Sequence, residues 1–239
     1  TPAVGYAPGA SDALAPAYLV YLASELSRSK PAYDVLIVLF SGYYHGLAGH
    51  RYFVEKYVFG GSGIPLGGMS VKLDPEKTIY VGVDLDSGSK YVAPASIGYF
   101  YTAQAIGITG GALDIYSAFI QEVLNPKTVE ERVSKTLGES IGRAVEQLIT
   151  YSRDPNAWWT LYPGPYWLET EPMWSAGLPA FTLKTAFVEK SYRCTPHDYL
   201  EYIDERNIAV QIRILNAIIV DTLLSKTPSE MARAISKGL

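Results

Sequence analysis

Cysteine and charge are both scarce in this chain. Its 239 residues contain one cysteine, Cys194, which excludes an internal disulfide and any metal site built on Cys-x-x-Cys pairs. Charged residues make up 18% of the chain and the net charge is −4, without a basic run, which argues against a nucleic-acid partner. The longest apolar runs, such as Val35–Phe40 and Ile214–Val220, are far too short to cross a membrane.

The remaining composition is that of a folded protein. Apolar residues make up 48% of the chain, and neither a repeat nor a low-complexity linker divides it, so we expect a single domain over residues 1–239. One unpaired cysteine is compatible with the cytosol and equally with the outside of a prokaryotic cell. Because the first residue is Thr1 rather than Met, we expect the domain to be truncated at its N-terminus.

Apolar patterning predicts alternating helices and strands. A helix is expected with Asp12 as its N-cap, and Gly60–Gly68 is expected to be a flexible connector. The other predicted elements are strands over Val35–Phe40, Thr78–Leu85 and Ala180–Leu183, and helices over Leu47–Phe59, Gly110–Leu124, Val129–Arg153, Asp204–Leu224 and after Pro228. This alternation indicates an α/β fold with a mostly parallel sheet, whose functional groups lie beyond the carboxyl ends of the strands.

Five segments, taken in order, carry a family resemblance. They read Pro-Gly-Ala-Ser-Asp, Phe-Ser-Gly-Tyr-Tyr-His-Gly-Leu-Ala-Gly, Val-Gly-Val-Asp, Ala-Gly-Leu-Pro-Ala and Tyr-Arg-Cys-Thr-Pro-His-Asp, and they lie at 8–12, 40–49, 81–84, 176–180 and 192–198. Together they resemble the co-catalytic two-zinc peptidase family that includes bacterial zinc aminopeptidases, glutamate carboxypeptidase II and glutaminyl cyclase. The resemblance implies a three-layer αβα fold with a central mixed, mainly parallel sheet.

The same resemblance implies roles for individual residues. Asp12 matches the carboxylate that bridges the two zinc ions, and Asp84 matches a terminal carboxylate ligand. Tyr43 and Tyr44 stand where the family has two consecutive glutamates, a base and a ligand, and Cys194 stands at the last histidine ligand. A phenol with a pKa near 10 is a poor base and a poor zinc ligand at neutral pH. We therefore expect these five positions to be vestigial, with neither a catalytic residue nor a bound metal.

These departures favour a non-catalytic binding or scaffolding domain. They resemble the degenerate branch of the family found in the peptidase-like subunit of the GPI-anchor transamidase. That likeness implies a protein partner or a peptide-like ligand, attachment to a membrane through regions outside this chain, and a place on the extracytoplasmic face of that membrane. The aromatic stretch Trp158–Trp174 is expected to form either a cleft wall or a contact surface, since Trp and Tyr dominate interface hot spots.

The alternative is a metal-dependent aminopeptidase or related hydrolase with a reduced site. Asp12 and Asp84 remain, and His45 would complete a mononuclear zinc site. Simpler explanations exist for most of the residues: Asp12 as a helix cap, Tyr43 and Tyr44 as packing residues, His45 and His50 as solvated loop histidines, and Cys194 as a small buried apolar residue.

Overall fold

The computed structural model describes residues 9–29, 31–95, 168–186, 188 and 190–238, with scattered positions between 119 and 138. Helices and short strands follow one another along this part of the chain, which confirms the α/β class in its coarse form. The helices are α1 Ala10–Ser29, α2 Ala48–Phe53, α8 Glu171–Ser175, α9 Glu205–Ile218 and α10 Pro228–Gly238, with the short turns η1 Tyr43–His45, η3 Pro75–Lys77 and η4 Leu200–Tyr202. The strands are β1 Ile64–Leu66, β2 Met69–Val71, β3 Tyr80–Asp84, β4 Tyr91–Ala95 and β5 Ala180–Ala186.

The main described sheet is small and mixed. Its strand order is β3-β5-β4, with β3 parallel to β5 and β4 antiparallel to β5. The predicted strands over Thr78–Leu85 and Ala180–Leu183 are confirmed as β3 and β5. The parallel pairing brings together two strands that lie about a hundred residues apart in sequence.

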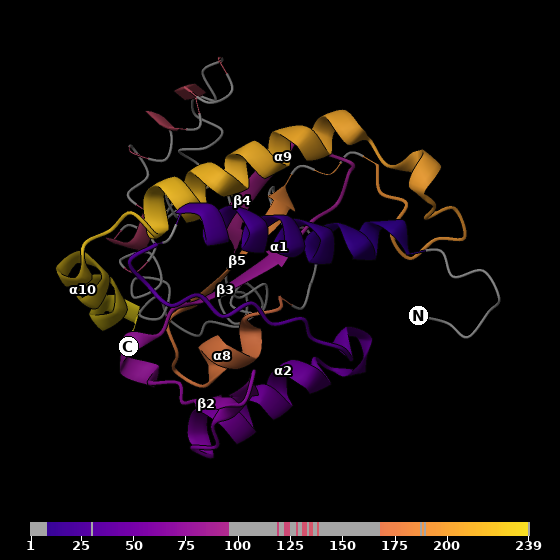
Figure 1. The fold of residues 1–239 in the computed structure, drawn as a ribbon. Helices are drawn as coiled ribbons and strands as arrows, with labels where there is room; N and C mark the ends of the chain where they lie inside the picture. The colour runs from indigo at the N-terminus through magenta and orange to yellow at the C-terminus, as the bar shows by residue number, and fades with distance from the viewer. Residues whose placement is uncertain are drawn as a thin grey trace, which may run out of the picture.

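Side chains alternate across β5 and so divide the core. Phe181 and Leu183 belong to the larger apolar cluster, which α1 and α9 cover, whereas Ala180 belongs to a second cluster beside α2 and α8. Figure 1 shows α1 and α9 lying along one another on one side of the sheet, with α8 and α2 on the other side. Both faces of β5 are therefore covered, as expected for the middle strand of this sheet.

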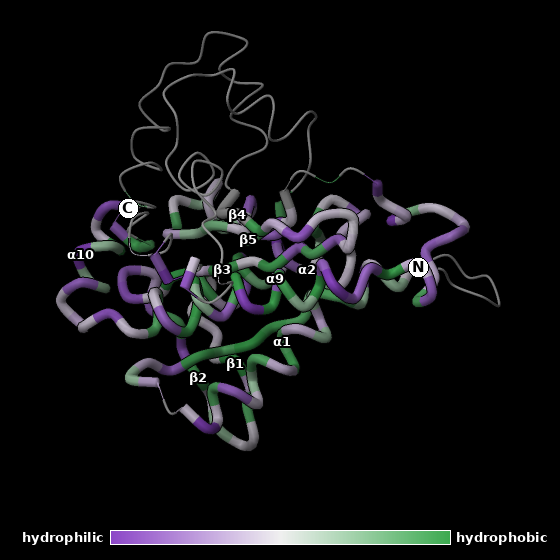
Figure 2. The backbone as a smooth tube through the Cα atoms, turned by 90° about the horizontal axis from the view of Figure 1, so that it is seen from above, coloured by the Kyte–Doolittle hydropathy of each residue, from purple (hydrophilic) through white to green (hydrophobic). Residues whose placement is uncertain are grey.

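The prediction of a strand over Val35–Phe40 is wrong for the described structure. The segment is extended, but it forms no ladder with any other described strand. Val38 and Phe40 pack against the second cluster, while Leu39 is exposed. Figure 2 shows the segment as an apolar stretch passing close to α1 and the β1–β2 hairpin. Apolar content alone predicted a strand here, although a strand also requires a hydrogen-bonded neighbour.

The glycine-rich stretch Gly60–Gly68 is not simply a connector. Its second half forms β1 and the loop of a hairpin, in which Leu66 pairs with Met69. Gly67 and Gly68 are the two loop residues, and both have a positive φ, 53° and 87°. Two left-handed residues in succession match the type I′ turn that suits a tight hairpin, so glycine is the residue required at both positions.

Several predicted helices are confirmed with altered ends. The helix predicted over Leu47–Phe59 is α2, which continues as the π-helical turn η2 Val54–Phe59. The helix predicted over Asp204–Leu224 is α9, with Asp204 as its N-cap, and it continues as the π-helical turn η5 Ile219–Leu223. The predicted helices within residues 110–153 lie largely outside the described residues, although the positions described between 119 and 135 are helical.

Within the described ranges, a single helix long and apolar enough to cross a membrane is not found. Glu205–Leu223 and Pro228–Lys237 reach the required length and composition only when taken together, as a pair bent by 106°.

Candidate functional site

A charged cluster begins where β3 and β5 end. The parallel register places Asp84 directly beside Lys184, and their side chains form an ion pair. The Asp84 side chain is buried, as is most of the Lys184 side chain. An ion pair taken out of water in this way is retained only if further polar groups compensate both charges.

Arg193 supplies that compensation from the loop after β5. Its Nη1 lies 2.5 Å from Asp84 Oδ1, and its Nη2 donates to the carbonyl oxygen of Leu85 at 3.1 Å. Its Nε lies 3.3 Å from Asp12 Oδ1 in the first turn of α1. One guanidinium group therefore contacts both carboxylates that the sequence analysis assigned to a vestigial metal site.

Neighbouring loops hold Arg193 in place through Asp86. The Asp86 carboxylate accepts hydrogen bonds from the Ser191 hydroxyl and from the amide of Gly88. Its backbone carbonyl accepts a bond from the buried Gln211 side chain of α9. The loop that carries Arg193 is thus joined to the β3–β4 turn, and that turn is joined to α9.

Asp198 fixes the start of α1 and with it Asp12. Its carboxylate accepts hydrogen bonds from the Ser11 amide at 2.9 Å and the Ser11 hydroxyl at 2.7 Å. Its carbonyl oxygen accepts from the amides of Gly9 and Ala10. The prediction that Asp12 caps this helix is therefore wrong: α1 begins at Ala10, and a residue distant in sequence satisfies its first amides.

The two tyrosines and the cysteine complete the cluster. The Tyr44 hydroxyl lies 2.9 Å from Cys194 Sγ, and the adjacent Tyr43 ring lies edge-on to that of Tyr44. Burial, followed by the negative charges of Glu169 and Asp84, raises the pKa of Tyr43 well above its usual value. Burial and the hydrogen bond to Cys194 do the same for the pKa of Tyr44. Both phenols are therefore neutral at physiological pH.

Glu169 is a member of this cluster that the sequence analysis missed. Burial, together with the negative charge of Asp84, raises the pKa of its carboxyl to about 8. Burial also disfavours the charged form of Asp84, but the Lys184 ammonium and the Arg193 guanidinium outweigh it and hold the Asp84 pKa below its usual value. These directions favour an ionised Asp84 and a protonated Glu169 at neutral pH. Nothing in the sequence distinguishes Glu169 from Glu171. Glu169 lies in the turn before α8, and its neighbour Thr170 is bonded to Thr182 of β5, a contact that the sequence does not reveal.

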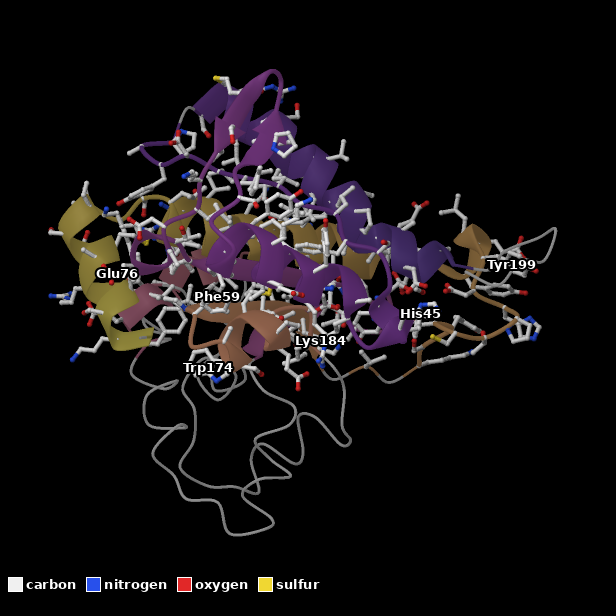
Figure 3. The ribbon with its side chains drawn as sticks, turned by 90° about the horizontal axis from the view of Figure 1, so that it is seen from below. His45, Phe59, Glu76, Trp174, Lys184 and Tyr199 are labelled. Carbon is white, nitrogen blue, oxygen red and sulfur yellow. The ribbon has the colours of Figure 1, made fainter. Side chains whose placement is uncertain are left out.

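The structure brings together the residues that the family resemblance singled out. Asp12 and Asp84 contact Arg193, Tyr44 contacts Cys194, and Tyr43 lies beside Tyr44. Figure 3 shows Lys184 near the middle of the view, with His45 beyond it and Tyr199 further out.

Two of the simpler explanations given to these residues are wrong. His50 is not a solvated loop residue, because it is 4% exposed and its ring packs against Phe40 with centroids 4.2 Å apart. Cys194 is exposed rather than buried. Its φ of 62° lies in the left-handed region, which is uncommon for a residue with a side chain.

In the described structure Asp12 and Asp84 face cations of the chain itself. Among the described residues, groups of three or more His, Cys, Asp or Glu side chains placed to hold a metal are not found, and Asp12, Asp84 and His45 are all described. The space between the two carboxylates is instead bordered by the positive groups of Arg193 and Lys184, which would repel a divalent cation.

Of the predicted aromatic stretch, only its last part is described. Trp174 is half-buried and packs against Phe119, with ring centroids 6.3 Å apart, so it is a core residue rather than an exposed anchor. Trp158, Trp159 and Trp167 lie outside the described residues.

Comparison with known proteins yields no match to this chain among family models, curated proteins or solved structures.

Proposed function

We propose that this chain is a non-catalytic, peptidase-like binding or scaffolding domain whose former metal site is now occupied by internal cations. The supporting observation is the position of Arg193, whose guanidinium contacts both Asp12 and Asp84. In the resembled family, a zinc ion would join the equivalent carboxylates. Here a side chain neutralises them, and the three-layer zinc-aminopeptidase architecture is part of the same proposal.

The chemistry of the surrounding side chains also supports the proposal. Hydrolysis by this family needs a carboxylate base, and Tyr43 and Tyr44 offer only neutral phenols. Of the further carboxyls described in the cluster, Asp86 is held by Ser191 and Gly88, and the raised pKa of Glu169 makes it a poor base at neutral pH. The mononuclear alternative based on Asp12, Asp84 and His45 lacks a comparable supporting contact.

The partner that we propose is a protein or a peptide-like ligand, bound on the extracytoplasmic face of a membrane to which the parent protein is attached. Exposed apolar side chains provide contact area on the described surface. They include Val35, Leu39, Phe59, Leu66 and Met69. Fractionation of cells that contain the native protein tests the location, because a membrane-attached protein sediments with membranes until detergent is added.

Metal content and hydrolysis test the core of the proposal. Elemental analysis of the purified chain, dialysed against a zinc-containing buffer and then against a metal-free one, should find less than one zinc per chain. Aminoacyl and peptidyl substrates should remain intact with zinc present. Stoichiometric zinc, together with hydrolysis that the Asp12→Asn substitution abolishes, would establish the enzyme instead.

A matched pair of double variants tests whether the internal cations are what prevents zinc binding. Replacing Arg193 and Lys184 with glutamine should expose the carboxylates of Asp12 and Asp84 and allow weak zinc binding. Replacing two exposed cations remote from the site, Arg28 and Lys77, should leave zinc binding unchanged. Equal zinc binding by both double variants would show that the internal cations are not what prevents zinc binding.

A further inference from the structure

The loop between β5 and α9 carries large apolar side chains in contact with solvent. Within residues 199–206 every position is exposed except Ile203. Leu200 is 80% exposed, Tyr202 is 42% exposed and Tyr199 is 36% exposed. Apolar side chains grouped in this way on a surface mark a contact site, whereas single scattered ones need no explanation.

Hydrogen bonds within the loop hold these side chains in their exposed positions. The amides of Asp198, Tyr202 and Ile203 each donate to the carbonyl oxygen three residues earlier. The carboxylate of Asp198 also accepts a hydrogen bond from the Ser11 hydroxyl in α1, which ties the loop to the body of the fold. A surface that is ordered before it meets a partner loses less conformational entropy on binding.

The aromatic rings of the loop form a small cluster that already holds a cation. The ring centroids of Tyr192 and Tyr202 lie 5.0 Å apart, and His197 meets Tyr202 edge-on at 6.2 Å. The ammonium group of Lys190 lies 4.8 Å from the centroid of the Tyr192 ring. The face of an aromatic ring attracts positive charge, so this contact shows the kind of group that the cluster favours.

The exposed stretch is negatively charged. Residues 199–206 contain three carboxylates, Glu201, Asp204 and Glu205, and one guanidinium, Arg206. Asp204 caps α9, but Glu201 and Glu205 take part in none of the ion pairs found among the described residues. Such a stretch would be repelled by an anionic lipid surface and attracted by a positively charged partner.

We propose that the surface of residues 192–205 binds a basic segment of a protein partner, with arginine preferred to lysine. A guanidinium group stacks on an aromatic ring and pairs with a carboxylate, while its methylene stem packs on an apolar side chain such as Leu200. Tyr202 and Glu201 are neighbours in the chain and offer these two contacts. This inference rests on the proposed binding function and names the chemistry of the partner.

A blocked hexapeptide with two arginines and an attached dye is the probe. Its fluorescence anisotropy is followed while the 239-residue chain is added at neutral pH and low salt. We expect a saturable rise, a weaker affinity when both arginines are replaced by lysine, and no binding when both are replaced by glutamine. The absence of saturable binding by the arginine peptide, or equal binding by the glutamine peptide, would overturn the proposal.

A matched pair of double variants tests the carboxylates. Glu201→Gln combined with Glu205→Gln should raise the Kd of the arginine peptide by about fivefold, the contribution of two exposed ion pairs. Glu55→Gln combined with Glu76→Gln removes two other exposed carboxylates and should leave the Kd unchanged. Figure 3 shows Glu76 and Tyr199 at opposite ends of the view. Equal weakening by both double variants would show that net charge, rather than this surface, attracts the peptide.

Tyr202→Leu tests the aromatic contact, because it keeps an apolar side chain and removes the ring. We expect a Kd about threefold higher for the arginine peptide, in a chain whose circular dichroism is unchanged. An unaltered Kd would contradict a role for the ring. Phosphatidylcholine vesicles test the other kind of occupant. Sedimentation of the chain with them, abolished by Leu200→Ser and without arginine-peptide binding, would assign the surface to a lipid and overturn the proposal.

This inference and the proposed function fail separately. The anisotropy is read at equilibrium, and a stable plateau shows that the peptide remains intact. Stoichiometric zinc with hydrolysis of other substrates would refute the proposed function and leave the arginine-peptide affinity as it is. Loss of arginine-peptide binding would refute this inference while the metal content of the chain stays the same.

Discussion

The guanidinium of Arg193 and the carboxylate of Asp84 are joined at 2.5 Å across 109 residues of sequence. Asp84 ends a central strand, and Arg193 lies in the loop that follows its parallel neighbour, so this contact links the strand end to the loop. Through Nε, the same guanidinium reaches Asp12 at the start of α1. Three separate parts of the chain therefore depend on one side chain for charge balance.

Arg193→Gln should destabilise the fold by about 3 kcal/mol, because it leaves the buried carboxylate of Asp84 with Lys184 alone. Urea denaturation followed by circular dichroism measures the change as a lower midpoint at an unchanged slope. The matched control is Arg28→Gln, which removes an exposed ion pair with Glu25 and should shift stability by less than about 0.5 kcal/mol. Equal effects of the two substitutions would contradict a structural role for Arg193.

Glu169→Gln should stabilise the fold at alkaline pH. The pKa of Glu169 is about 8 in the folded chain, against 4.5 when exposed, so the folded state binds more protons between these values. Wild-type stability should therefore fall as pH rises from about 4.5 to about 8, and the glutamine variant should lack this loss. The stability difference should reach about 3 kcal/mol at pH 9 in favour of the variant, because solvent screens part of the Glu169 charge.

The exposed Glu76→Gln variant serves as the control for Glu169. It should follow the wild-type pH profile throughout. A constant offset between wild type and Glu169→Gln at every pH would mean that the carboxyl of Glu169 does not titrate as described.

The sequence predicted the cluster better than it predicted the sheet. Asp12, Tyr44, Asp84 and Cys194 were singled out because the short motifs that contain them resemble those of the two-zinc peptidase family. Such motifs are runs of neighbouring residues, so they can be recognised without knowledge of the fold. Val35–Phe40 has equally strong apolar character, but its pairing depends on residues far away in the chain.

The residues that give the cluster its charge could not be predicted from the sequence. Lys184 reaches Asp84 only because the β3–β5 register aligns them, and Arg193 does so only because its loop folds back over β3. Asp198 likewise caps a helix that begins 188 residues earlier in the chain. Neither hydrophobic periodicity nor local motif spacing contains information about such pairings.

Asp198→Ala should destabilise the fold by about 2 kcal/mol. The substitution removes the acceptor for the Ser11 amide and hydroxyl, both of which are buried. Asp204→Ala is the matched control, because Asp204 caps α9 locally from an exposed position and its loss should cost about 1 kcal/mol. Thermal unfolding of both variants gives the comparison. A smaller loss at Asp198 than at Asp204 would show that the start of α1 finds other acceptors.

The stability of the fold should also decrease in acid because of His50. Burial lowers the pKa of this histidine from 6.5 to about 4, and none of the described residues gives its Nδ1 a hydrogen bond that could stabilise the charged form. Between pH 6.5 and 4 the unfolded chain therefore binds a proton at His50 that the folded chain does not, so stability falls as pH is lowered through this window. The full shift corresponds to about 3 kcal/mol at pH 4.

Carboxyl groups also contribute in this range, and comparison with His50→Gln separates the two effects, since the variant retains only the carboxyl contribution. Urea midpoints are measured at pH 4.5, 5.5, 6.5 and 7.5. The difference in midpoint between wild type and His50→Gln should be largest at pH 7.5 and should shrink toward pH 4.5. His45→Gln, which replaces an exposed histidine five residues earlier, should keep the wild-type pH slope. Parallel profiles for wild type and His50→Gln would show that His50 does not resist protonation in the folded chain.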